Sequence, residues 1–237
     1  ITRKILKRSL YLFLIGLFLN AYPHFDFPNL RIPGVLQRIS LVFLVIALMH
    51  HYADKVTQKW VAAGLLVVYW MLMSFVPVPG VGEANLEPET NLAAWFDRLF
   101  LTGHMWGITK TWDPEGFLST LPAIVTGLLG MFAGSHLFKN EDKQKALTEL
   151  LVAGNILIVV SLAWDMTFPI NKSLWTSSFV LYTGGIAINF FAVLYWLLDV
   201  RKYRSKMLFP MEVFGSNAIT VYTFAGVLAN TIALISL

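Results

Sequence analysis

The stretch SLWTSSFVLYTGGIAINFFAVLYWLL, from Ser173 to Leu198, contains no charged side chain. It is much longer than the roughly 9–11 residues of a membrane barrel strand, and it lacks the alternation of polar and apolar residues that such strands show. Its length and composition are those of a helix that crosses the hydrocarbon core of a bilayer. The stretch therefore predicts a transmembrane α-helix.

Similar apolar runs recur along the whole chain. Only 14% of the 237 residues are charged, against roughly 25% in an ordinary soluble domain. We predict an all-α fold, a polytopic transmembrane helical bundle of about seven spans that forms a single domain over residues 1–237. The predicted spans are Ser9–Tyr22, Pro33–His50, Trp60–Val76, Glu115–Phe138, Leu147–Asp165, Leu174–Leu198 and Met211–Leu237.

Composition excludes several classes of protein. A soluble globular enzyme needs a more polar surface, and a disordered chain needs low hydrophobicity and high charge. The net charge is +4, but the basic residues are spread between long apolar runs, so we expect no nucleic-acid partner. There is no cysteine, which excludes disulfides, thiolate nucleophiles and Cys–metal sites, and we expect no metal.

The basic residues indicate the orientation in the membrane. If the N-terminus is cytoplasmic, the inner loops His51–Lys59, Lys139–Lys145 and Asp199–Lys206, together with the N-terminal flank, hold most of the 18 lysines and arginines. We therefore expect a multi-pass protein of the cell (inner) membrane. Because the chain begins at Ile1 beside a span and ends in an apolar helix, we also expect further spans before and after it.

The outer side then carries one long loop, residues 77–114. Within it, NLAAWFDRLF places Leu92, Trp95, Phe96 and Leu99 on one helical face. This pattern predicts an amphipathic helix that lies at the outer membrane interface.

Polar residues inside or beside the spans are the candidates for a site. Arg38 follows Gln37 about five residues into its span, where it either extends to the headgroups or faces a partner or a wet cavity. Asp165 ends the fifth span, as a simple interface residue or as the partner of Arg38. Asn217, in the seventh span, needs an interhelical hydrogen bond or a cavity.

The outer loop adds further candidates. WDPEG, from Trp112 to Gly116, has the pattern of a helix start, with Asp113 as cap, Pro114 in the first turn and Glu115 complementing the helix dipole. His104 is either a solvated loop residue or a general base. Ala123, Gly127, Gly130 and Gly134 predict a smooth face for close helix packing.

Six motifs, taken together, resemble one family. In chain order they are RIPGVLQR (31–38), DRLFLTGH (97–104), WDPEG (112–116), PINKSLWTSSFV (169–180), LDV (198–200) and FPMEVFGSNAITVY (209–222). They resemble the heparan-α-glucosaminide N-acetyltransferase family and its bacterial relatives, some of which are described as N-acetylglucosamine-related membrane proteins or transporters. The resemblance covers nearly the whole chain.

The resemblance implies a membrane acyltransferase that moves acetyl from acetyl-CoA to the amine of an extracytoplasmic glucosamine-type sugar. It places the principal catalytic histidine upstream of Ile1, so the catalytic residue of this chain is unknown. A transporter of amino sugars or N-acetylated sugars is the alternative. The expected partners are the lipid bilayer, the amino-sugar acceptor and, as an open alternative, a second copy of the chain.

The residues expected to bind the sugar or the acyl donor share the outer side or the interior of the spans. They are Arg31, Gln37, Arg38, Asp97, His104, Asp113, Glu115, Asp165, Asn171, Lys172 and Asn217. Under this resemblance, Arg31, Arg38 and Lys172 supply cations for the phosphates of CoA, and Asp113 and Glu115 hold the ammonium and hydroxyls of the sugar.

Overall fold

Helices form nearly all the regular structure of the chain. The computed structural model describes residues 1–206 and 208–235. The helices are α1 (Thr2–Ala21), η1 (Phe27–Asn29), α2 (Val35–Tyr52), α3 (Lys55–Phe75), α4 (Leu92–Leu101), α5 (Thr120–Lys139), α6 (Lys143–Asp165), α7 (Ser177–Tyr195), η2 (Trp196–Val200), α8 (Leu208–Ser216) and α9 (Ala218–Ile235). Over these residues the only β-structure is one isolated bridge, Val78 to Gly82. The predicted all-α fold is confirmed.

Six of these helices are long and apolar enough to cross a membrane: α2, α3, α5, α6, α7 with η2, and α9. The first predicted span corresponds to α1, whose first two turns carry several basic residues. Large apolar side chains such as Val159, Phe190 and Phe224 are exposed on the outside of the bundle. Such a surface is stable in lipid and not in water, so this is a multi-pass membrane protein.

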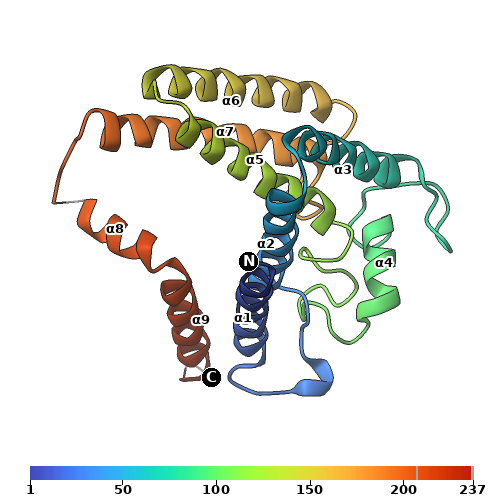
Figure 1. Ribbon diagram of the computed structural model, residues 1–237. Helices are drawn as coiled ribbons and strands as arrows, with labels where there is room; N and C mark the ends of the chain where they lie inside the picture. The colour runs from blue at the N-terminus through green and yellow to red at the C-terminus, as the bar shows by residue number, and fades with distance from the viewer. Residues whose placement is uncertain (207, 236–237) are drawn as a thin grey trace.

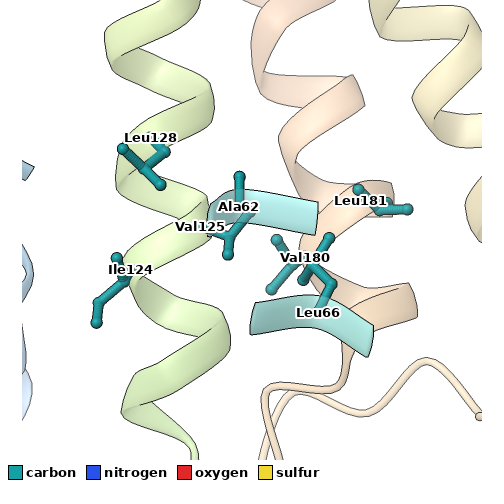
Figure 2. Packing of buried hydrophobic residues seen from close by; sticks show 7 residues of the cluster. All are labelled: Ala62, Leu66, Ile124, Val125, Leu128, Val180 and Leu181. Carbon is teal, nitrogen blue, oxygen red and sulfur yellow. The ribbon is translucent and has the colours of Figure 1, made fainter. Parts of the chain in front are cut away.

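The helices pack as two groups that meet at α5. Figure 1 shows α6 and α7 side by side, with α5 next to them and α1 beside α2. Figure 2 shows where α3, α5 and α7 meet, through the buried side chains of Ala62, Leu66, Ile124, Val125, Leu128, Val180 and Leu181. This core fixes the relative positions of the helices that lead into the connecting loops.

Three connecting segments gather at one end of the bundle. They are residues 22–34, 76–119 (which include α4) and 166–176, and we call this end the α4 end. A second core, with Tyr69, Leu92, Phe168 and Leu174 among its members, joins α3, α4 and the segment after α6. The hydroxyl of Tyr69 donates to the Leu174 carbonyl at 2.6 Å. The α4 end is therefore packed against the bundle rather than loosely attached to it.

Side-chain caps set several helix starts. Asp54 accepts from backbone N–H groups of the first turn of α3, Asn91 accepts from Ala94 of α4, and Thr176 accepts from Phe179 of α7. Each cap satisfies donors that have no partner inside the helix.

The predicted start of the fourth span is wrong. The span was expected to begin at WDPEG, but α5 begins at Thr120, after Ser119. Asp113 does not cap a membrane helix because its carboxylate is bound by Arg31 and by the backbone N–H groups of Trp106 and Glu115. These contacts hold residues 112–116 in a turn.

The seventh predicted span is two helices, α8 and α9, with a break at Asn217. The side chains of Ser216 and Asn217 donate to carbonyls of the preceding turn, which competes with the helical backbone hydrogen bonds. Asn217 is exposed, and among the described residues its side chain bonds to Val213 and Ser216 of α8, so the expected interhelical bond is absent there. The last two residues of this predicted span, 236–237, lie outside the described part of the chain.

The long loop contains a helix, α4, at the predicted position, but the buried face of this helix differs from the predicted one. Leu92 is buried as expected, whereas Leu99 is 57% exposed. Ala94 and Asp97 are buried instead, because the polar contacts of Asp97 orient the helix.

Only part of the predicted smooth face of α5 is used for close packing. A Cβ atom on Gly127 would lie 2.7 Å from a methyl of Val42 in α2, whereas Gly130 and Gly134 face open space. Among contacts with backbone atoms, the tightest joins other helices: a Cβ atom on Gly185 of α7 would lie 2.5 Å from the carbonyl oxygen of Gly154 in α6.

Candidate functional site

The polar side chains of the α4 end form a connected cluster. The segment before α2 joins the segment after α4 through two contacts, from Ile32 N to the His104 carbonyl at 2.9 Å and from the His104 ring to the Leu30 carbonyl at 2.8 Å. Residues more than 70 positions apart in sequence are thereby held together.

Arg31 forms the centre of an ion-pair network. Its guanidinium donates two bonds to the buried carboxylate of Asp113, at 2.8 and 2.7 Å, and one to Glu115. The same group lies 5.5 Å from the ring centre of Trp106. Burial by itself lowers the pKa of Arg31, but the bonds and charges of Asp113 and Glu115 outweigh it and leave this pKa above its ordinary value.

Arg38 is buried inside the protein and does not extend to the surface. One of its terminal nitrogens donates to the Pro114 carbonyl at 2.6 Å and to the hydroxyl of Ser119. Its guanidinium lies 5.0 Å from the ring centre of Trp175. The carboxylates of Glu115, Asp113 and Asp97 are near enough to act on its charge, without a direct bond in the described residues.

Three buried donors in this region have no acceptor among the described residues. They are Nε and Nη1 of Arg38 and Nε2 of Gln37. The Gln37 side chain lies against Gly16 and Gly34. A Cβ atom on either glycine would lie within 2.6 Å of the Gln37 side-chain oxygen, so no larger residue fits at these two positions. A buried donor left without a partner costs free energy, and each such group calls for an explanation such as a bound ligand.

Asp97 connects α4 to the turn that holds Asp113. Its carboxylate accepts from the backbone N–H groups of Phe117 at 3.0 Å and Asp113 at 3.4 Å. Gly116 is required beside it, because a Cβ atom there would lie 2.0 Å from a carboxylate oxygen. Burial raises the pKa of Asp97 more strongly than the two N–H bonds lower it, so this pKa is about 6.

The cluster encloses little space. A cavity of about 10 Å³ lies beside Asp97, Asp113 and Ser119, which is room for about one water molecule. The side chains of Arg31 and Glu115 reach the surface, with 22% and 17% of their area exposed. The enclosed space is therefore too small for a sugar, and the cluster is accessible from outside at its edge, where Arg31 and Glu115 are partly exposed.

His104 is held in one orientation by the Leu30 carbonyl. A carbonyl only accepts, so Nδ1 of His104 is the donor in that bond. In the neutral ring the lone pair is then on Nε2. The geometry is compatible with a general base at the α4 end.

The remaining predicted residues have other contacts. Asp165 accepts from Ile170 N at 2.6 Å, so the interpretation of Asp165 as the direct partner of Arg38 is wrong. Asn171 accepts from the backbone of Ser173 and stabilises a turn, and Lys172 is exposed at the same end. Asn217 lies between α8 and α9, and its side chain has no described contact with the cluster.

Sequence reasoning missed three residues that orient the two arginines. Ser119 and Trp175 contact Arg38, and Trp106 contacts Arg31. For Ser119 a signal was present, since a serine before an apolar run is a common helix N-cap. Across the described ranges no group of three or more His, Cys, Asp or Glu residues has the arrangement of a metal site.

The fold and the cluster together define a class: a multi-pass helical membrane protein with a buried arginine and an ion-pair network at one end. No family model matches the chain. The chain is similar to the heparan-alpha-glucosaminide N-acetyltransferase of Mus musculus, with 28% identity over 96% of the chain, and to that of Homo sapiens, with 27%. It spans about 42% of the length of these curated relatives. The comparison confirms the family resemblance that the motifs indicated.

Proposed function

We propose that this chain is the core of a membrane acetyltransferase that moves acetyl from acetyl-CoA to the amine of a glucosamine-type sugar at the α4 end. The observation that carries the proposal is the similarity to curated N-acetyltransferases along 96% of the chain. The chain covers less than half of those relatives, so the proposal concerns the full-length protein.

Arg38 fits a role in binding negative charge. Attack of an amine on a thioester carbonyl produces a tetrahedral oxyanion, which needs preorganised donors. Two buried N–H groups of Arg38 have no acceptor in the described residues, and its other nitrogen is fixed by Pro114 and Ser119. A guanidinium held in this way stabilises an oxyanion or a phosphate with little reorganisation.

The acidic residues fit the acceptor sugar. Glu115 is partly exposed beside Arg31, where it is able to bind the ammonium or hydroxyl groups of an amino sugar. The attacking amine must also lose a proton to a general base. The resemblance implies a histidine upstream of Ile1 for this step, and His104, with Nε2 as acceptor, is a second candidate.

The orientation forms part of the proposal. The loops of the α4 end carry few basic residues, and the opposite end carries many, which favours an extracytoplasmic α4 end and a cytoplasmic N-terminus in the cell membrane. The acceptor would then be acetylated outside the cytoplasm.

The test is an assay of the purified full-length protein with acetyl-labelled acetyl-CoA and glucosamine. We expect labelled N-acetylglucosamine, in an amount that depends on protein concentration. Uptake of the sugar into proteoliposomes without acetylation would instead identify a carrier and overturn the proposal.

A further inference from the structure

A second cavity lies at the end of the bundle opposite the α4 end. It has a volume of about 660 Å³ and lies along α5, between the first turns of α3 on one side and α6 on the other. The polar cluster of the α4 end contributes no residue to it. It therefore needs an explanation of its own.

The mouth of this cavity is cationic. Lys55 and Lys59 of α3 and Lys139 of α5 line it, and the ammonium groups of Lys55 and Lys139 are close enough to repel each other. Over the described part of the chain, none of the three forms a salt bridge. The nearby acids have other roles: Asp54 caps α3, and Glu149 pairs with His136 at 2.8 Å.

The walls of the cavity are apolar. Leu129 and Phe132 of α5, Leu150 and Ile156 of α6, and Ile188 of α7 line it. The polar Gln58 at the mouth is already used, because its amide donates to two backbone carbonyls, at 3.0 and 2.9 Å. The cavity thus has a cationic mouth and an apolar interior.

We propose that this cavity binds an anionic phospholipid, with its phosphate between Lys55, Lys59 and Lys139 and an acyl chain along α5. A phosphate relieves the repulsion between the two facing ammonium groups, and basic pockets between membrane helices bind anionic headgroups. The aliphatic wall suits an acyl chain. The amide-containing arm of coenzyme A fits it less well, because its amide groups would be left without hydrogen-bond partners there. This site is independent of the proposed acetyl transfer.

Native mass spectrometry of the full-length protein tests the proposal, with phosphatidylglycerol and phosphatidylcholine as the two probes. We expect wild-type protein to retain phosphatidylglycerol and to release phosphatidylcholine at the same activation energy. The double variant Lys55→Gln/Lys139→Gln should bind phosphatidylglycerol roughly 30-fold more weakly. Lys145→Gln, an exposed lysine of α6 outside the cavity, is the control and should bind as the wild type does.

A second pair of variants tests the acyl-chain part without altering charge. Ala153→Trp fills the cavity from an exposed wall position and should abolish retention, while Val152→Trp, its exposed neighbour outside the cavity, should not. Equal retention of the two lipids, or equal behaviour of the paired variants, would overturn the proposal. Displacement of phosphatidylglycerol by free coenzyme A would also overturn it, since the phosphate site would then belong to the acyl donor.

Discussion

At the scale of single residues, Arg38 has the clearest chemical requirement, because two of its N–H groups are buried without an acceptor in the described residues. We expect Arg38→Ala and Arg38→Lys each to lower kcat for acetyl transfer by roughly 10²-fold or more, since lysine lacks the planar fork of donors. The measurement is steady-state kinetics of the full-length protein. Lys145→Ala is the control, and a wild-type rate in Arg38→Ala would remove Arg38 from the site.

Asp97 should make the α4 end sensitive to pH. Its pKa is raised from 3.8 to about 6 in the folded state, so the folded protein binds its proton more tightly than the unfolded chain does. The contribution of Asp97 to the stability of this end is therefore largest below pH 3.8. It decreases as the pH rises, and a free energy on the order of 3 kcal/mol is lost once the pH exceeds about 6.

Hydrogen exchange of the amides of Asp113 and Phe117, corrected for intrinsic rates, measures this dependence because both amides bond to Asp97. In Asp97→Asn the change in protection between pH 4 and about 6.5 should disappear. Protection that instead increases with pH in the wild type would contradict the assigned shift.

The sequence indicated Arg38, Asp113 and Glu115 as candidates, because charge within or beside an apolar span is costly and needs compensation, and the structure places all three in the polar cluster of the α4 end. The sequence was not sufficient to pair them. The acids bind Arg31, and Arg38 binds a carbonyl and Ser119, because the turn at 112–116 is held by Asp97 from a different helix. Such pairings depend on contacts between segments that no local pattern encodes.

At the scale of helices, hydropathy located the spans but not all of their ends. Length and apolar composition are averaged over about 20 residues, whereas an end depends on one or two side chains. The start of α5 at Thr120 and the break at Asn217 were set by the local hydrogen bonds of Asp113 and Ser216. Close helix packing was likewise predicted at α5 but is tightest between α6 and α7.

This packing predicts opposite effects at two helical glycines. Gly185→Ala should destabilise the protein by about 1–3 kcal/mol, because its Cβ atom would lie 2.5 Å from the Gly154 carbonyl oxygen and neither backbone moves easily. Gly130→Ala faces open space and should stabilise by about 0.5–1 kcal/mol through helix propensity. Thermal unfolding in detergent measures both, and equal effects would contradict the contact.

At the scale of the whole molecule, the uneven distribution of basic residues predicts the orientation. Cysteines introduced at exposed Glu83 and Gln144 provide a test, since the chain has no cysteine of its own. In sealed vesicles, a membrane-impermeant maleimide should label Glu83→Cys only from the extracytoplasmic side and Gln144→Cys only from the cytoplasmic side. Labelling of both from one side would refute the topology.

Our central proposal is that the full-length protein moves acetyl from acetyl-CoA to an amino sugar at an extracytoplasmic α4 end, and we also propose that acetyl-CoA is supplied from the cytoplasmic side. The most direct measurement uses full-length protein in sealed inside-out vesicles, with labelled acetyl-CoA added outside and glucosamine enclosed inside. We predict labelled N-acetylglucosamine in the vesicle interior, and none when Arg38→Ala replaces the wild type. Formation of the product only when glucosamine is on the same side as acetyl-CoA would contradict the account.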